Sequence, residues 1–315
     1  MSTPGKILVT GAGGQVGSDL TTALRQRYGD GNVVASDKND LEHVGLWRRL
    51  DTSDKDELNE VVVDYGVGTI FHLAAVLSAV AEKEPVRAWR VNMDGLLNVL
   101  ETARAHRCRV FFPSSIGTFG PLSPRMNTPQ DTIQRPNTMY GITKLTGELL
   151  CDYYHRHHGV DTRGIRYPGI ISWSHTPGGG TTDYAVEIFK AALTRGHYEC
   201  YLKPETALPM IYMPDAVRAA IELMEAPETR LMHRNGFNVT AMSFTPRELA
   251  LEIRNFIPTF RMTYKIDPAR QAIADSWPQS LDDSAARHEW GWNHVFDLEP
   301  MVADMLNKLS AKGRV

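Results

Sequence analysis

The sequence predicts a protein of the α/β class, with a doubly wound parallel β-sheet and a smaller C-terminal lobe. Short β-branched runs alternate with longer amphipathic runs through its first half, and a glycine-rich turn joins the first strand to the first helix. Strands and helices that alternate in this way place the strands side by side in parallel, with helices on both faces of the sheet. A chain of 315 residues is long enough for one large domain and a smaller lobe.

The expected elements follow one another from the N-terminus. Strands are expected over Lys6–Thr10, Val33–Ser36, Thr69–His72, Val110–Pro113 and Thr162–Arg166. Helices are expected over Gln15–Arg27, Lys55–Tyr65, Glu82–Ala105 and Asn137–His157, and later over Tyr184–Thr194, Ala216–Glu225, Pro246–Phe256 and Glu299–Ser310. We therefore expect residues 1–166 to form a first domain, and residues 167–315 to form mainly a second lobe that is interleaved with it.

Composition narrows the classes of partner. The 34 Lys and Arg residues against 37 Asp and Glu residues give a net charge of −3, which lacks the basic field that attracts nucleic acid. No apolar run has the length of a membrane span, and the first residues lead directly into a strand, so neither a membrane segment nor a leader is expected. The three cysteines are isolated, which disfavours a disulfide framework and a zinc site. These features predict the cytoplasm as its location.

The turn after the first strand has the spacing of a dinucleotide-binding site. Gly11, Gly14 and Gly17 allow a tight turn, a close approach of the backbone to a pyrophosphate, and close packing of helix on strand. The N-terminus of the helix then offers N–H groups to the pyrophosphate. Asp37 ends the second strand, where an acidic side chain accepts hydrogen bonds from ribose hydroxyls and repels a 2′-phosphate. The turn predicts a Rossmann domain that binds NAD, while the adjacent Lys38 leaves NADP open.

Tyr140 and Lys144 carry the expected proton chemistry. Four residues apart in a helix, they share one face. A tyrosine hydroxyl has a pKa of about 10, and an adjacent ammonium group favours the phenolate. Tyr140 is thus predicted to act as the general base that removes a proton from a substrate alcohol, assisted by Lys144.

Three motifs together resemble the extended short-chain dehydrogenase/reductase family, which includes nucleotide-sugar epimerases. They are GxxGxxG at Gly11–Gly17, HLAA at His72–Ala75, and a serine at the end of a strand followed by YxxxK at Tyr140–Lys144. The resemblance implies a catalytic serine hydroxyl, which falls on Ser115 with Ser114 as the alternative. It implies NAD as the cofactor, held by Gly11, Gly14, Gln15, Val16, Gly17, Asp37, Lys38, Asp51, Thr52, Leu73, Ala74, Ala75, Asn92, Tyr140, Lys144, Tyr167, Pro168 and Ile170.

The second half resembles the short-chain type of L-threonine 3-dehydrogenase. Residues 177–185 read PGGGTTDYA, and the stretches 208–216, 241–246 and 274–278 extend the likeness over nearly the whole chain. The resemblance implies that NAD+ oxidises the 3-hydroxyl of L-threonine to L-2-amino-3-oxobutanoate, in threonine breakdown towards glycine or aminoacetone. The substrate-binding residues expected on this basis are Ser78, Ser115, Tyr140, Gly179, Gly180, Thr181, Thr182 and Trp277.

Several alternatives stay open at this stage. The glycine–threonine stretch fits a grip for a carboxylate, a lid hinge, or an ordinary loop that caps a helix. Trp277 fits a pocket wall or the core. The histidines at 155, 157 and 158 fit a solvated helix end, so no metal is expected.

The function itself has two alternatives. One is a nucleotide-sugar epimerase or dehydratase, against which Pro168 and Gly169 replace an asparagine that those enzymes usually carry. The other is a non-catalytic NAD-sensing regulator, which would tend to lose Tyr140 or Lys144. Resemblance to the four-helix interface of family members implies a homodimer, formed by the helices over Glu82–Ala105 and Asn137–His157.

Overall fold

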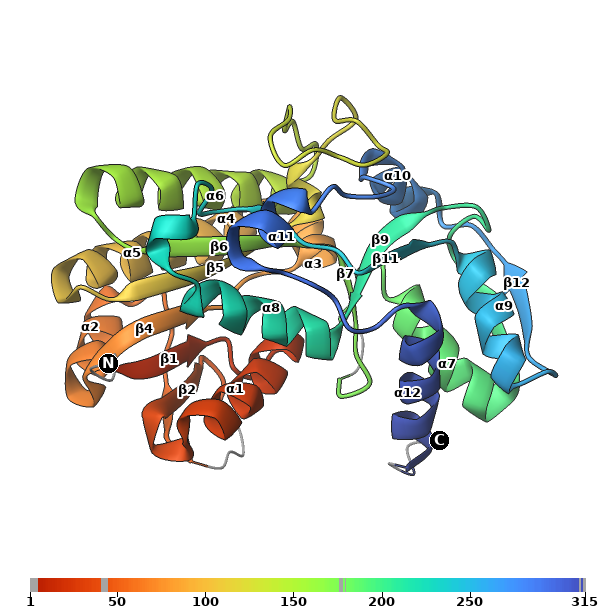
Figure 1. Ribbon diagram of the computed structural model, residues 1–315, viewed down its shortest axis with the longest axis horizontal. Coiled ribbons are helices and arrows are strands. Elements are labelled where there is room, and N and C mark those ends of the chain that lie inside the picture. The colour runs from red at the N-terminus through yellow and green to blue at the C-terminus, as the bar shows by residue number, and fades with distance from the viewer. Residues whose placement is uncertain (1–4, 41–44, 176–177, 179, 312, 314–315) are drawn as a thin grey trace.

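The largest sheet of the protein has seven parallel strands and lies in the left-hand part of Figure 1. The computed structural model describes residues 5–40, 45–175, 178, 180–311 and 313. The strand order is β10-β6-β5-β4-β1-β2-β3. These strands are β1 (Lys6–Thr10), β2 (Val33–Asp37), β3 (Trp47–Arg49), β4 (Val67–His72), β5 (Arg109–Ser115), β6 (Thr162–Tyr167) and β10 (Phe237–Asn238). The predicted α/β fold with a doubly wound sheet is confirmed.

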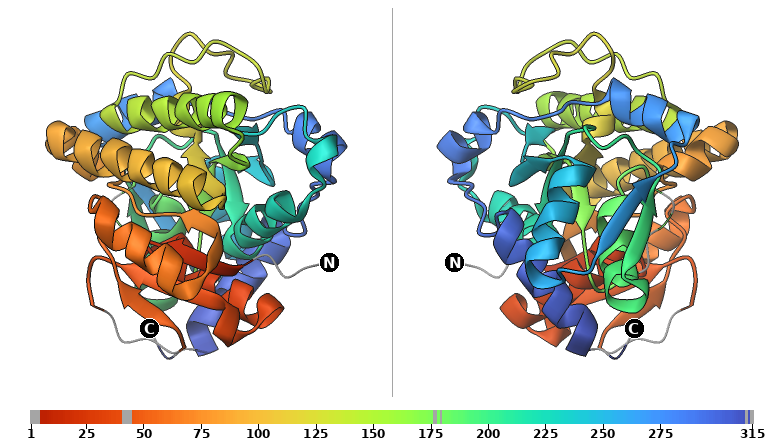
Figure 2. Two further views of the ribbon diagram at one scale, coloured as in Figure 1. Left: turned by 90° about the vertical axis from the view of Figure 1, so that its left-hand side faces the viewer. Right: turned by 90° about the vertical axis from the view of Figure 1, so that its right-hand side faces the viewer.

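Helices cover both faces of this sheet, as the two views of Figure 2 show. One face packs against α2 (Lys55–Tyr65), α5 (Gly95–His106) and α6 (Met139–His158). The other face packs against α1 (Gln15–Tyr28), α8 (Met213–Glu225) and α11 (Ser284–Trp290). Burial on both faces explains why the strands are almost continuous runs of apolar residues.

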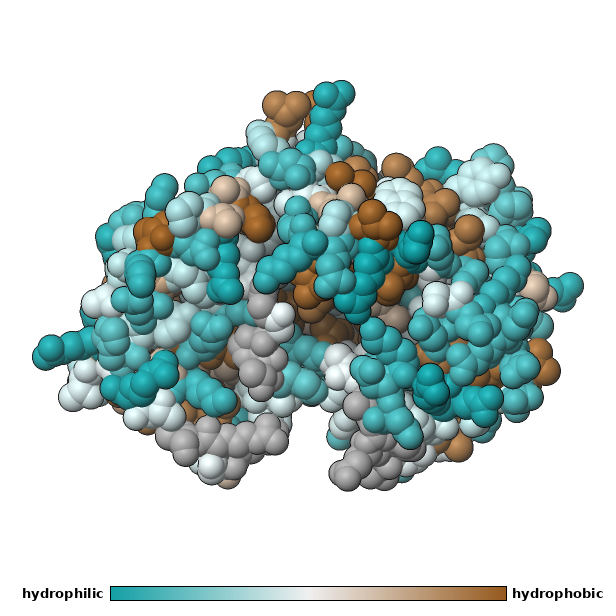
Figure 3. Space-filling model, turned by 180° about the vertical axis from the view of Figure 1, so that it is seen from behind, coloured by the Kyte–Doolittle hydropathy of each residue, from teal (hydrophilic) through white to brown (hydrophobic). Residues whose placement is uncertain are grey.

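Most of the second half forms a separate core. Its strands make a three-stranded sheet and a two-stranded sheet, with β7 (Gly169–Ile171), β8 (His197–Cys200), β9 (Leu208–Tyr212), β11 (Met242–Phe244) and β12 (Arg261–Tyr264). Its helices are α7 (Tyr184–Arg195), α9 (Pro246–Phe256), α10 (Pro268–Ser276) and α12 (Leu298–Ala311). Seen from behind, the surface is hollowed between the two halves, with apolar residues inside the hollow (Figure 3). Three elements of the second half, α8, β10 and α11, return to the main sheet.

The described chain also has short helical turns at Asp30–Asn32, Ile116–Thr118 and Glu228–Arg230. None of the helices that the structure describes is long and apolar enough to cross a membrane.

The single helix expected over Glu82–Ala105 is wrong. The structure has α3 (Ser78–Lys83), α4 (Pro85–Trp89), a π-helical turn at Arg90–Asp94 and then α5. Pro85 has no N–H to continue a helix, and it holds Glu84 before it at φ −129° and ψ 62°, outside the helical region. At the π turn, the side chain of Asn92 accepts a hydrogen bond from the Val76 amide at 2.7 Å and donates to the Val76 carbonyl at 3.2 Å. The break therefore anchors the chain that follows β4.

The helix that carries Tyr140 and Lys144 lies very close to the sheet. A Cβ placed on Gly147 of α6 would come within 2.3 Å of the Phe112 ring of β5. That same ring lies under the Lys144 ammonium, 4.9 Å from the ring centroid to Nζ. The missing side chain at Gly147 thus sets the distance between α6 and β5.

We expect Gly147→Ala to lower the free energy of unfolding by about 1–3 kcal/mol, because the added methyl group overpacks a filled core. Urea unfolding followed by circular dichroism measures this change. Thr146→Ala, at the preceding and partly exposed position of α6, is the matched control and should shift stability by less than about 0.5 kcal/mol. Equal midpoints for the two variants would show that α6 can move off β5 without cost.

Candidate active site

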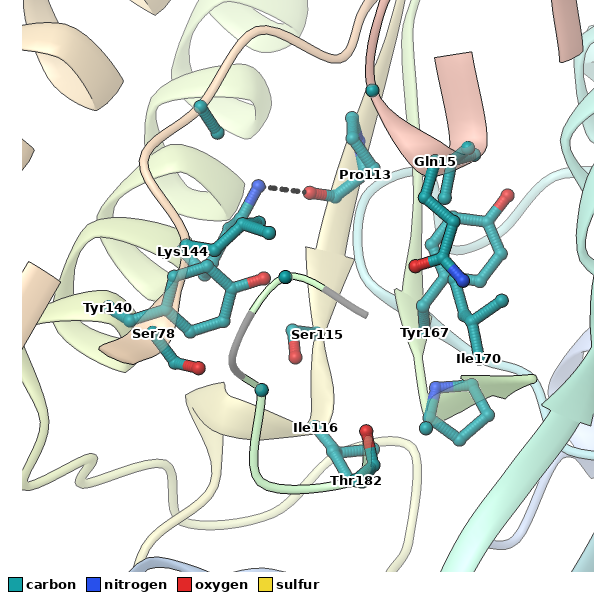
Figure 4. A pocket seen from close by; sticks show the side chains of 18 of the residues that line it. Gln15, Ser78, Pro113, Ser115, Ile116, Tyr140, Lys144, Tyr167, Ile170 and Thr182 are labelled. Carbon is teal, nitrogen blue, oxygen red and sulfur yellow. Dashed lines mark hydrogen bonds between the residues drawn. The ribbon is translucent and has the colours of Figure 1, made fainter. Parts of the chain in front are cut away.

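A cavity of about 270 Å³ lies at the carboxyl ends of the central strands. Open α/β sheets bind their ligands at this edge, where strand order reverses. Here the reversal falls between β1 and β4. Predicted residues that line the cavity are Gly11, Gly14, Gln15, Val16, Gly17, Leu73, Ala75, Ser78, Ser114, Ser115, Tyr140, Lys144, Tyr167, Pro168, Ile170, Gly180, Thr181, Thr182 and Trp277 (Figure 4).

Some expected residues lie elsewhere. The described residues Asp37, Lys38, Asp51, Thr52, Ala74 and Asn92 are not among those that line the cavity. The amide of Asn92 instead holds Val76 and donates to the Thr143 hydroxyl at 3.1 Å. Gly179 lies outside the described residues.

Other residues of the cavity wall are not among the site residues predicted from the sequence. They are Leu77, Pro113, Ile116, Gly169, Gly178 and Asp183. Pro113 and Ile116 flank the serines at the end of β5, and this position is the signal from which they could have been predicted.

The glycine turn fits a dinucleotide. Gly11 has φ +69°, and a Cβ on it would meet the backbone nitrogen of Ala74 at 2.7 Å. A Cβ on Gly17 would come within 2.2 Å of the Gly11 carbonyl oxygen. Within the described chain no side chain caps the N-terminus of α1, and no acidic residue stands in its first turn. This end of the helix can therefore receive an anionic pyrophosphate.

Asp37 is tied to the same turn. Its carboxylate accepts hydrogen bonds from the Gly13 amide at 3.2 Å and from the Asn39 amide at 3.1 Å. The carboxyl end of β2 is thereby fixed beside the turn, where an adenosine ribose would lie in a Rossmann domain. The residues present fit NAD.

Tyr140 and Lys144 lie on the inner side of α6. The Lys144 ammonium, 5% exposed as a residue, donates to the Pro113 carbonyl of β5 at 2.7 Å. It also lies 5.6 Å from the centroid of the Tyr140 ring. Figure 4 shows Tyr140, Ser115 and Ser78 around the same part of the cavity. The arrangement places a phenol, an ammonium and a hydroxyl where they can share a proton.

Burial governs the protonation of this pair. It raises the pKa of Tyr140 to about 12, against a lowering by the Ser115 hydroxyl. It lowers the pKa of Lys144 to about 8, and the neighbouring Cys151 and Glu148 oppose that change. The expected fall in the pKa of Tyr140 next to Lys144 is therefore not found in the protein by itself, because loss of hydration outweighs the ammonium.

The two serines at the end of β5 have different partners. Ser114 donates its hydroxyl to the carboxylate of Glu148 behind the sheet. Ser115 accepts a hydrogen bond from the Gly117 amide at 3.1 Å. Its hydroxyl also lowers the pKa of Tyr140 through a hydrogen bond. The geometry favours Ser115 as the hydroxyl that meets a substrate.

The loop before α7 closes the cavity from the second half. The Gly180 amide donates to the Asp183 carboxylate at 2.6 Å, so it is already engaged within the loop. Thr181 is buried, Thr182 is partly exposed, and both line the cavity. Trp277 is only 6% exposed and belongs both to the core of the second half and to the cavity wall.

A glycine turn at the point of strand reversal, with a Tyr–Lys pair and a serine in the same cavity, defines a nucleotide-dependent oxidoreductase. The sequence profile described as "NAD dependent epimerase/dehydratase family" matches residues 7–239. The chain belongs to this family, the extended short-chain dehydrogenases/reductases, and its cofactor is NAD.

Similar proteins cover the whole chain. A Staphylococcus aureus (strain USA300) protein described as an uncharacterized epimerase/dehydratase is 48% identical over 98% of both chains. The solved L-threonine dehydrogenase of Clostridium difficile is 54% identical, with a TM-score of 0.97 over 98% of both chains. A monomeric L-threonine 3-dehydrogenase from a metagenome is 45% identical, with a TM-score of 0.94 over 97% of this chain and 99% of that one.

We expect Ser115→Ala to lower turnover of an alcohol substrate by about 10²-fold or more, because it removes the hydroxyl next to Tyr140. Ser114→Ala, the matched control, should cost less than about tenfold, since its hydroxyl faces Glu148. Initial rates of NADH formation, measured at saturating NAD+, report both values. If Ser114→Ala costs as much as Ser115→Ala, the assignment of the reacting hydroxyl to Ser115 fails.

Proposed function

We propose that the protein oxidises the 3-hydroxyl of L-threonine to L-2-amino-3-oxobutanoate with NAD+, a step of threonine breakdown towards glycine or aminoacetone. The observation that carries the proposal is the likeness to L-threonine dehydrogenases, which continues through the second half of the chain. That half supplies the loop and the tryptophan that close the cavity over Tyr140. The three cysteines are free and buried, which agrees with action in the cytoplasm.

The residues around Tyr140 would carry the proton. Bound NAD+ supplies the hydride acceptor and a positive charge. The positive charges of bound NAD+ and of Lys144 would favour the phenolate form of Tyr140. As the C3–H bond breaks, this phenolate would take the proton of the substrate hydroxyl, so that the carbonyl forms without a free alkoxide. Lys144 holds a positive charge beside the phenol, and Ser115 donates a hydrogen bond to the substrate oxygen.

The polar groups of the second half would hold the two ends of the amino acid. Thr181 and Thr182 offer hydroxyls to its carboxylate, and Ser78 offers another polar contact. Asp183 lines the same cavity and supplies a negative charge suited to an ammonium group. Trp277 and Ile116 would enclose the methyl group of the substrate.

We expect L-threonine and NAD+ to yield NADH, and Tyr140→Phe to lower kcat by about 10²-fold or more, with NADH binding kept. The variant retains the ring and its packing, and it loses only the group that takes the proton. NADH absorbance measures turnover, and NADH fluorescence measures binding. Tyr65→Phe on α2, outside the cavity, is the matched control.

The substrate panel separates this proposal from an epimerase. L-serine and L-allo-threonine test the grip on the methyl group and its configuration. UDP-galactose with NAD+ tests for UDP-glucose, the product that a nucleotide-sugar epimerase would form. Release of UDP-glucose without NADH formation from L-threonine would overturn the proposed substrate.

We also propose that two copies associate through α5 and α6. These helices lie side by side (Figure 2). Their outer sides expose large apolar side chains, among them Leu97, Leu149 and Tyr153, with exposed fractions of 42%, 61% and 50%. Apolar residues grouped in this way on two neighbouring helices are typical of a four-helix interface.

We expect Leu149→Lys to convert the dimer into a monomer, because the interface would have to bury an unpaired ammonium group from each copy. Light scattering coupled to size exclusion measures the mass. Leu251→Lys on α9, whose leucine is 51% exposed, is the matched control and should leave the mass unchanged. A wild-type mass of one chain would contradict the proposed dimer.

A further inference from the structure

A buried carboxylate lies behind the active site. Glu148 of α6 and Arg166 of β6 are 4% and 5% exposed, and they form a two-pronged ion pair. Arg166 Nε lies 3.0 Å from Glu148 Oε1, and Arg166 Nη2 lies 2.9 Å from Glu148 Oε2. A Cβ on Gly236, which has φ +71°, would come within 2.6 Å of this carboxylate. The chain at Gly236 therefore leaves room for the Glu148 carboxylate only because this residue has no side chain.

The pair joins three parts of the site. Ser114, next to Ser115, donates its hydroxyl to Glu148. Arg166 directly precedes Tyr167 and Pro168 of the cavity wall. Glu148 itself stands four residues after Lys144 and eight after Tyr140, so all three share one face of α6.

The same arginine holds the long connection between Ser115 and Tyr140. Its Nη1 donates to the Gln130 carbonyl at 2.8 Å, and its Nη2 donates to the Gln134 side chain at 3.2 Å. Both residues lie in the segment that leads from β5 to α6. The ends of that segment carry the hydroxyl and the phenol of the active site.

From these contacts we propose that Glu148 is a positioning residue of the active site, which fixes the end of β5 through Ser114 and supplies the buried negative charge beside the Lys144 ammonium. The inference rests on the proposed alcohol oxidation at Tyr140. Glu148 is not among the described residues that line the cavity, so it would act through its neighbours.

The charges around Lys144 support the second part of this role. Glu148 and Cys151 act on it from its own helix, and His72 faces it from β4. Burial raises the pKa of the Cys151 thiol well above its usual value and lowers the pKa of His72 to about 3, so both groups are neutral near pH 8. Of these described neighbours, Glu148 is the one that carries a negative charge.

Glu148→Gln tests the role, because it keeps the shape and removes the charge. Without the carboxylate, the pKa of Lys144 falls below its value of about 8, by about one unit. The alkaline limb of the pH profile of kcat moves to lower pH by the same amount. We expect kcat to fall by about tenfold, since Ser115 is held less well. We expect the Kd of NADH to change by less than about twofold.

Ser114→Ala separates position from charge. It removes the tie to β5 and leaves the Glu148–Arg166 pair, so kcat should fall several-fold with an unshifted pH profile. Asp215→Asn is the matched control for loss of a buried carboxylate paired with arginine. Asp215 is 1% exposed on α8 and binds Arg218 at 2.8 Å, outside the cavity. It should lower Tm without shifting the profile.

A readout without substrate keeps this inference distinct from the proposed function. The titration of the Lys144 side chain is followed by NMR of ¹³C-labelled lysine, with Lys144→Arg to assign the signal. A lower pKa of Lys144 in Glu148→Gln supports the role even if L-threonine is not the substrate. An unshifted titration in a folded Glu148→Gln variant overturns it. If Glu148→Gln does not fold, a Ser114→Ala variant with wild-type kcat overturns it.

Discussion

The close contact of α6 with β5 is the constraint on which the site depends. Gly147 lets the helix approach the sheet so that Phe112 fills the space where a side chain would stand. At that distance Lys144 reaches the Pro113 carbonyl of β5, and Glu148 reaches Ser114 one residue further along the same strand. The phenol of Tyr140 then lies beside Ser115, at the edge of the sheet where the glycine turn begins a helix. One packing distance thus sets three polar contacts.

Much of this arrangement was predictable from local patterns. Strand–helix alternation gave the parallel sheet, because each run of buried strand residues needs helices on both faces. The spacing of Gly11, Gly14 and Gly17 located the turn, since each has a steric reason to lack a side chain. The prediction of one helix over Glu82–Ala105 was wrong at Pro85, because it followed the amphipathic spacing although a proline has no N–H to continue a helix. The choice between Ser114 and Ser115 depended on Glu148, a contact across 34 residues that periodicity does not reveal.

The electrostatics of the pair required the structure. Spacing of four residues in a helix correctly places a lysine near a tyrosine, and a charge rule then predicts a more acidic phenol. The rule omits hydration, which both groups lose in this cavity, so the pKa values move in the directions set by burial. Charges that lie behind the site therefore gain importance. The role that we propose for Glu148 follows from this. Its carboxylate would keep Lys144 protonated, and the protonated lysine would favour the Tyr140 phenolate.

The substrate was the hardest feature to predict, because the two halves of the chain supply different parts of the cavity. In the proposed reaction the glycine turn would serve the cofactor and the Tyr140–Lys144 pair would serve the proton, and an NAD-dependent epimerase or dehydratase would need the same two features. The groups that we propose for the rest of the substrate come from the segment 180–183 and from Trp277, which reach the cavity through loops rather than through the sheet. Loops have no periodicity that fixes where a side chain points. The Asp183 carboxylate shows the consequence, because its bond to the Gly180 amide takes an N–H that the glycine-rich stretch would otherwise offer to a substrate carboxylate.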